Sequence, residues 1–218
     1  VVDGDKNLPE CYSSSGNFFR EKIDFSKHLQ NPKDKLDLLM LYCFELGSRF
    51  GCEFSDETCN ILESMLFDAK RHGKKVIFPS AELEEHFHFL DIKGVIGASL
   101  KVFQEDPKKE TVLRHLGLAS RIYYNLRDYD GDLRAGFVNI SSEDIERFGI
   151  APNNLENRLS NSVRNLFLNT AQRGIDLLDE HGKAMQTADF RRLTRLTLNV
   201  VYEMPARRYF VRVLEDVF

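Results

Sequence analysis

Residues 127–136 read RDYDGDLRAG, and this stretch places two carboxylates, Asp128 and Asp132, four positions apart. Side chains four residues apart lie on the same face of a helix, where two like charges repel by about 0.2–0.5 kcal/mol. Two hard oxygen ligands at this spacing suit Mg²⁺, which takes one or two carboxylates and fills its other positions with water and phosphate oxygens. The alternative is a solvated acidic helix face that Arg127 and Arg134 neutralise. The spacing alone leaves both interpretations open.

The residues before this stretch predict one long helix from Asp106 to Ala135. It begins with an N-cap acid followed by Pro107, a strong start signal. A polar stripe runs along it at spacings of three, four and four residues: Arg121, Tyr124, Asp128 and Asp132. Acids near a helix C-terminus oppose the helix dipole, which disfavours a purely structural role for them. We expect Arg121 to approach Asp128, directly or through a ligand, because an unpaired cation beside an apolar cavity is unfavourable.

A second predicted helix, from Ser55 to Gly73, carries another candidate carboxylate. Met65 lies in an apolar row along this helix, and Asp68 extends the row with an acid. Taken alone, Asp68 is expected near the helix end and partly solvated. If this helix faces the Asp106–Ala135 helix across a cavity, three carboxylates converge on that cavity.

Helical periodicity dominates the rest of the chain, which predicts an all-α protein with residues 1–218 forming one domain. A short strand is suggested only at Lys75–Phe78, where Pro79 ends it. The other expected helices cover residues 17–30, 33–50, a segment from 80 onward, 141–149, 155–181, 187–204 and a last short helix from 206.

Composition excludes several classes of function. Hydrophobic residues make up 42% of the 218 residues, charged residues 29%, and the net charge is −4, which is typical of a globular protein. This mild charge, without a Lys/Arg-rich run, gives no sign of nucleic-acid binding. Apolar runs stay below 18 residues and a signal peptide is not recognisable, so we expect an intracellular protein, cytoplasmic or peripheral to a membrane. The first residue is Val1 rather than Met, which indicates a processed or incomplete chain.

The four cysteines, at positions 11, 43, 52 and 59, form neither a CxxC pair nor a zinc pattern. Three of them lie in apolar helical stretches, which predicts buried free thiols in a reducing compartment.

Several motifs together resemble the squalene and phytoene synthase family. Residues 116–119 (LGLA), 126–128 (LRD), Asp132 and Gly136 match the second Asp-rich region of that family, LGxAxQxxNxxRDxxxDxxxGRxYLP. Residues 142–150 (SEDIERFGI) resemble the short helix that follows it and ends in phenylalanine-glycine.

The resemblance extends upstream. Met65 and Asp68 are similar to the GMxxDL segment, and residues 94–97 (GVIG) to the AGxVG segment. Residues 1–3 (VVD) look like the tail of the first Asp-rich motif, DDxxD, so the similarity covers nearly the whole chain and begins inside that motif.

The resemblance implies a terpenoid-synthase-like helical bundle around a central cavity. It also implies an enzyme of isoprenoid biosynthesis that joins two prenyl diphosphates head to head with Mg²⁺, or Mn²⁺ in its place; use of NADPH cannot be judged. The residues that match imply metal ligands at Asp128, Asp132 and Asp3 and catalytic roles for Asp128, Asp132 and Asp68. From their positions in the same segments, we expect substrate contacts from Arg121, Tyr124, Arg127 and Met65.

The chain departs from the family pattern at important positions. Arg121 stands where the family has glutamine, and Tyr124 where it has asparagine. The GRxYLP segment reads GFVNIS at residues 136–141, so Phe137 replaces an arginine that could form bidentate bonds to phosphate. A second hypothesis is therefore a non-catalytic relative that keeps the fold as a binding or assembly module. It would resemble the phytoene-synthase-like assembly factors of respiratory complex I, act through a protein partner, and be compatible with a mitochondrial location.

Overall fold

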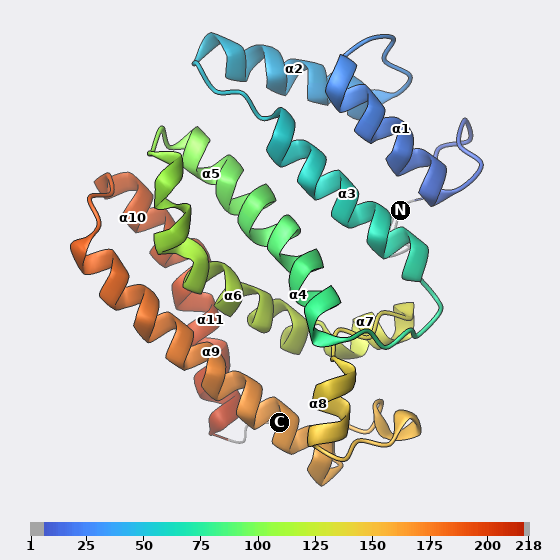
Figure 1. Ribbon diagram of the computed structural model, residues 1–218, viewed down its shortest axis with the longest axis vertical. Coiled ribbons are helices and arrows are strands. Elements are labelled where there is room, and N and C mark those ends of the chain that lie inside the picture. Colours follow the sequence, from blue (N-terminus) through green and yellow to red (C-terminus); the bar gives the residue numbers. More distant parts are fainter. Residues whose placement is uncertain (1–6, 216–218) are drawn as a thin grey trace.

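The computed structural model describes residues 7–215, and their regular structure is entirely helical, as predicted (Figure 1). The first helices are α1 (Ser15–His28), α2 (Lys35–Arg49) and α3 (Ser55–Arg71). A continuous helical segment follows, made of α4 (Ser80–Phe87), the π-helical η1 (His88–Ile96) and α5 (Gly97–Val102). Next come the 3₁₀ turn η2 (Pro107–Lys109), α6 (Glu110–Arg127), α7 (Tyr129–Ala135), α8 (Ser142–Arg147), the 3₁₀ turn η3 (Pro152–Asn154) and α9 (Asn161–Thr187). The chain ends with α10 (Arg192–Leu198), the π-helical η4 (Asn199–Glu203) and α11 (Met204–Leu214).

The helices pack as a stack that Figure 1 shows from top to bottom. The helix α3 lies between α1 and the α4–η1–α5 segment, and α6 lies between η1 and α9, which packs in turn on α11. The larger hydrophobic cluster joins η1, α6, α9 and the C-terminal helices, while the smaller joins α1, α2 and α3. The site described below lies between η1 and α6.

Glycines from the recognised motifs permit the close packing of these helices. At Gly94 a Cβ atom would lie 2.6 Å from Cγ1 of Ile61 on α3, and at Gly117 it would overlap Ile92 of η1. A side chain at either position would force the contacting isoleucine to move within a closely packed interior. These two glycines therefore set the spacing of α3, η1 and α6, on which the geometry of the cavity depends.

The predicted helix from Asp106 to Ala135 is divided in the structure. The backbone leaves helical geometry at Asp128 (φ −94°, ψ 4°), which ends α6 and precedes α7. The change of direction buries Tyr129, whose hydroxyl donates to the carbonyl of Leu155 at 2.7 Å. Tertiary burial of this tyrosine thus competes with continuation of the helix.

Other predicted boundaries also shift. The helix expected over 155–181 begins at Asn161, where the Ser160 side chain caps it, and the one expected over 187–204 is α10 with η4. The strand suggested at Lys75–Phe78 was wrong, because this segment is a loop. Within the described residues, two backbone hydrogen bonds join this loop and the residues just before it to the end of α7: Gly73 N to Ala135 O and Lys75 N to Gly136 O.

This loop, which runs from α3 to α4, contacts the end of α7. Gly136 has a positive φ of 84°, and its Cα packs directly against the backbone of Gly73. A residue with a side chain would be strained at that φ and would also clash there. The contact brings Asp68 and Arg71 of α3 to the segment after α7.

The cysteine prediction was correct in one respect. All four are free thiols, but Cys11 and Cys43 are exposed and Cys52 and Cys59 are half-buried, so the predicted burial was wrong. Cys43 lies on α2, whose outer face exposes apolar side chains such as Leu39 and Tyr42. Within residues 7–215, none of the helices has the length and apolar character needed to cross a bilayer.

Candidate functional site

A mainly apolar cavity of about 230 Å³ lies between η1, α6 and the α10–η4 segment. Its walls are formed by Leu90, Asp91, Val95, Ile96, Ser99, Leu116, Gly117, Ser120, Arg121, Tyr124, Leu198 and Tyr202. The Ser120 hydroxyl is buried and has no hydrogen-bond partner among residues 7–215. We call this space the apolar cavity.

Arg121 forms the polar end of the apolar cavity. Its Nε and Nη2 donate to the two oxygens of Asp91 on η1, each at 2.7 Å, and its guanidinium lies 4.4 Å from the centre of the Phe87 ring. Both side chains are mostly buried, with 19% and 15% exposed. This is the bidentate geometry in which an arginine holds a carboxylate most firmly.

The electrostatics of Arg121 involve three carboxylates. Burial by itself lowers the pKa of Arg121, but the charge on Asp91, with further contributions from Asp68 and Asp132, raises that pKa above its ordinary value. The predicted direct approach of Arg121 to Asp128 is not found, because the Arg121 guanidinium donates to Asp91 and Asp128 pairs with Arg127. The long helix ends at Asp128, while η1 places a carboxylate directly opposite Arg121.

Asp128 lies at an exposed corner instead. Its two oxygens accept hydrogen bonds from Nε and Nη2 of the adjacent Arg127, at 2.8 and 2.6 Å, and both side chains are 43% exposed. The guanidinium of Arg127 also covers the ring of Tyr124, at 4.8 Å from its centre. Tyr124 itself lines the apolar cavity, and burial raises its pKa.

Asp132 and Asp68 are held by different partners. Asp132 accepts a hydrogen bond from Nδ2 of Asn139 at 2.8 Å. Asp68 lies 2.7 Å from Nη2 of Arg71 and 3.3 Å from Nε2 of His86. Burial would raise the pKa of Asp68, but the imidazole of His86 and the charge on Arg71 outweigh this effect and hold the pKa below its ordinary value.

Phe137 takes the place of the family arginine, and Arg71 brings a cation to it. The Arg71 guanidinium lies 4.9 Å from the centre of the Phe137 ring and donates to the carbonyl of Val138. Only 5% of Arg71 is exposed. The positive charge missing from the sequence motif is therefore supplied near the same segment by α3.

The candidate carboxylates within residues 7–215 are each held by a protein partner. Residues 7–215 hold no group of three His, Cys, Asp or Glu side chains arranged to bind a metal ion. A cation already pairs with Asp128, with Asp68 and with Asp91, and an amide binds Asp132. Asp3, the remaining predicted ligand, lies outside the described residues.

Met65, the other predicted substrate contact, packs in the smaller hydrophobic cluster. It lines neither the apolar cavity nor the more polar cavity next to it. That second cavity is a space of about 190 Å³ between α4, α6, α8 and α9, which also contains Arg121 and includes Asn125 and Asn139. The side-chain carbonyl oxygens of both asparagines are buried and lack a hydrogen-bond partner among residues 7–215.

Sequence reasoning missed Asp91 and Tyr202, which face the apolar cavity. Asp91 had a signal: it is an acid inside the apolar run HFLDIKGVI, residues 88–96. A buried charge of this kind requires a partner from another element. Tyr202 had none, because a tyrosine on an amphipathic helix is unremarkable.

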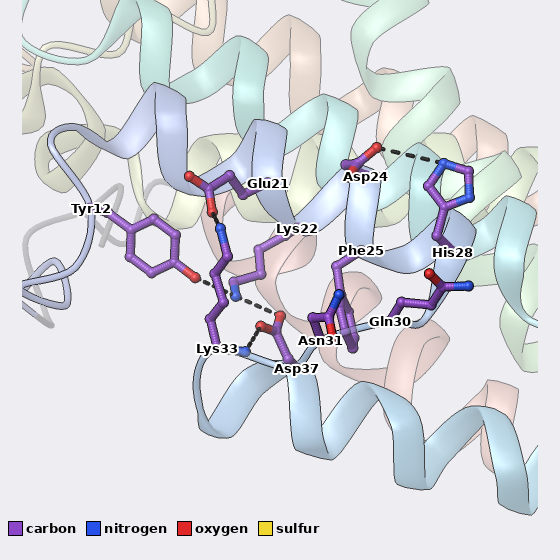
Figure 2. Close-up of a pocket in the computed structure, with 10 residues that line it drawn as sticks. All are labelled: Tyr12, Glu21, Lys22, Asp24, Phe25, His28, Gln30, Asn31, Lys33 and Asp37. Atoms are coloured by element: carbon purple, nitrogen blue, oxygen red, sulfur yellow. Dashed lines mark hydrogen bonds and ion pairs between the residues drawn. The ribbon is translucent and has the colours of Figure 1, made fainter.

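A further cavity, of about 290 Å³, lies between α1 and α2 (Figure 2). Figure 2 shows the buried Lys22 pointing toward Tyr12 and Asp37. Its Nζ lies 2.5 Å from Asp37, 2.7 Å from Asp34 and 2.7 Å from the Tyr12 hydroxyl. Burial by itself lowers the pKa of Lys22, but these three partners outweigh burial, so the pKa lies above its ordinary value. The three bonds satisfy the ammonium group, so this cluster stabilises the packing of α1 on α2.

Comparisons with known proteins agree with the fold. No family model matches the chain, and no curated protein matches it by sequence. The structure is similar to the crystal structure of squalene synthase HpnC from Alicyclobacillus acidocaldarius, with a TM-score of 0.63 and 16% sequence identity, over 93% of this chain and 81% of that chain. The chain therefore has an all-α fold like that of squalene synthase.

Proposed function

We propose that this chain uses the squalene-synthase fold to bind an isoprenoid chain without condensing two prenyl diphosphates. The observation that supports this most strongly is the bidentate Arg121–Asp91 pair at the polar end of the apolar cavity. A metal-bound diphosphate would require free carboxylates there, whereas this pair places a cation beside Asp68 and Asp132.

The size and chemistry of the apolar cavity support one apolar ligand. Cavities that bind small molecules typically measure about 300–1,000 Å³, and this one, at about 230 Å³, is smaller. It suits a segment of one isoprenoid chain rather than two chains side by side. The unpartnered Ser120 hydroxyl offers such a ligand one polar contact.

The second candidate function is Mg²⁺-dependent head-to-head prenyl transfer, as in a squalene or phytoene synthase. Retention of both Asp128 and Asp132 favours it. With Asp3, these residues would hold Mg²⁺, which in such a reaction stabilises the charge of the departing diphosphate. Protein-partner binding, as in an assembly factor, is compatible with the first proposal.

The two functions differ in their dependence on metal. Farnesol and farnesyl diphosphate can each be titrated into the protein by calorimetry, in Mg²⁺ and in EDTA, while released diphosphate is assayed. We expect both ligands to bind with similar affinity in either buffer, without release of diphosphate. Release that requires Mg²⁺ and disappears in Asp128→Asn and Asp132→Asn would instead establish the synthase.

A cavity-filling variant tests where the ligand binds. Ser99 lines the apolar cavity, and its hydroxyl bonds only to the Val95 carbonyl of its own helical segment among the described residues, so Ser99→Phe should fill the space and weaken farnesol binding at least tenfold. The matched control is Thr111→Phe on exposed α6 surface, where the hydroxyl likewise bonds to a carbonyl one turn back. Equal affinity of the two variants would place the ligand elsewhere.

A further inference from the structure

The C-terminal helix is apolar on two sides. The segments α10, η4 and α11 continue into one another from Arg192 to Leu214, and their inner side is buried at Leu198, Ala206, Phe210 and Val213. The outer side exposes a second apolar row: Leu193, Leu196, Val200, Val201, Met204 and Val211. A helix that is hydrophobic around its circumference is normally covered on all sides. We call the second row the outer stripe; residues 7–215 leave it uncovered.

Positive charge accompanies the outer stripe. Residues 191–215 contain six arginines and two glutamates, and Glu203 is paired with Arg207. Three arginines (Arg207, Arg208 and Arg212) line one surface groove with Met204, Val211 and a single acid, Glu215, so cations and apolar side chains share this side of the helix. Among residues 7–215, Arg208 and Arg212 have neither an ion pair nor a hydrogen-bond acceptor for their guanidinium groups.

We propose that the outer stripe docks on an anionic lipid bilayer, with the helix lying in the plane of the membrane surface. Helices that lie in this interface bury an apolar row among the acyl chains and place arginines against anionic headgroups. The outer stripe, with Arg208 and Arg212, which have no acidic partner within residues 7–215, supplies both contacts. A second copy of this chain docked through the same outer stripe would instead set these arginines against arginines of like charge.

Docking would bring the apolar cavity close to the lipid. Leu198 and Tyr202 line the cavity, while Leu196 and Val200 of the same helix face outward. One helix thus separates the cavity from the proposed membrane surface, at the π-helical segment η4. Such π-helical irregularities are frequent at functional sites. The docking itself does not depend on the proposed ligand, so a failure to bind farnesol would leave it standing.

Vesicle co-sedimentation tests the docking surface. The probes are vesicles of phosphatidylcholine alone and of phosphatidylcholine with phosphatidylglycerol, at low and high salt. We expect binding that requires phosphatidylglycerol and weakens with salt. The double variant Arg208→Gln/Arg212→Gln should weaken it by roughly tenfold or more, and Leu196→Ser/Val200→Ser by at least about tenfold.

The matched control lies on α2, where Leu39 and Tyr42 are 55% and 62% exposed, similar to Leu196 at 60% and Val200 at 52%. The variant Leu39→Ser/Tyr42→Ser should bind vesicles like the unmodified chain, and circular dichroism should show all variants folded. Three outcomes would overturn the proposal: no binding to either vesicle, equal loss in the α2 variant, or binding that the outer-stripe variants retain. A dimer, detected by light scattering, that Leu196→Ser/Val200→Ser dissociates would assign the surface to self-association instead.

Discussion

Two arginine–aspartate pairs of this protein have similar bidentate geometry and very different surroundings. Arg127 and Asp128 are adjacent in the sequence and 43% exposed, whereas Arg121 and Asp91 come from different helices and are less than 20% exposed. Exposed ion pairs contribute up to about 1 kcal/mol, but removing one partner of a buried pair leaves an uncompensated charge. The motif aspartate therefore belongs to the weaker pair, and an aspartate outside the motif belongs to the stronger one.

The largest expected effect tests the buried pair. Arg121→Gln, which restores the family residue, should lower the free energy of unfolding by about 3 kcal/mol because Asp91 loses its counter-charge. Urea denaturation measures this. Adding Asp91→Asn should recover most of the loss, since a neutral amide needs no cation. A single variant as stable as the unmodified chain would show that solvent already screens Asp91.

A smaller effect concerns Asp68, which is also buried beside cations. Its pKa is held below the ordinary value, so its stabilising contribution is present above the unfolded pKa of about 3.9 and is lost as pH falls toward the folded pKa. Asp68→Asn should therefore cost about 2 kcal/mol at pH 7 and much less near pH 3. Melting temperatures of both proteins across this range test the prediction. A difference that stays constant with pH would mean that Asp68 acts through packing alone.

The smallest effect belongs to the exposed pair. Asp128→Asn should change the free energy of unfolding by less than about 1 kcal/mol, and high salt should reduce the difference further. Urea denaturation at low and high salt compares it directly with Arg121→Gln. If Asp128→Asn proves as costly as the Arg121 variant, the contrast between the two pairs is wrong.

Part of this structure could be predicted from the sequence. The helical character and the polar stripe of α6 follow from periodicity, which acts within a few residues. The predicted helix from Ser55 is also found, although the Ser55 side chain makes no capping hydrogen bond. The shared cavity position of Arg121 and Tyr124 follows from the same periodicity. The division of the long helix at Asp128 could not be predicted, because burial of Tyr129 against residues of α9 and its preceding loop decides it.

The partners of the charged side chains could not be predicted from the sequence either. Arg121 could be placed on the correct face of α6, but the acid opposite it comes from η1, thirty residues earlier in the chain. Likewise, Asp68 could be identified as a polar group at the end of α3, while His86 reaches it from α4. Pairings of this kind depend on how helices cross, and short-range patterns do not encode the crossing.

The sequence by itself determined that this protein is helical and which side chains of α6 share a face, because hydrogen bonding and periodicity are local. Only the tertiary structure decided which acid meets which arginine, where the apolar cavity lies, and which apolar row remains uncovered. Those outcomes depend on burial and electrostatics between distant segments, which exist only once the helices have packed.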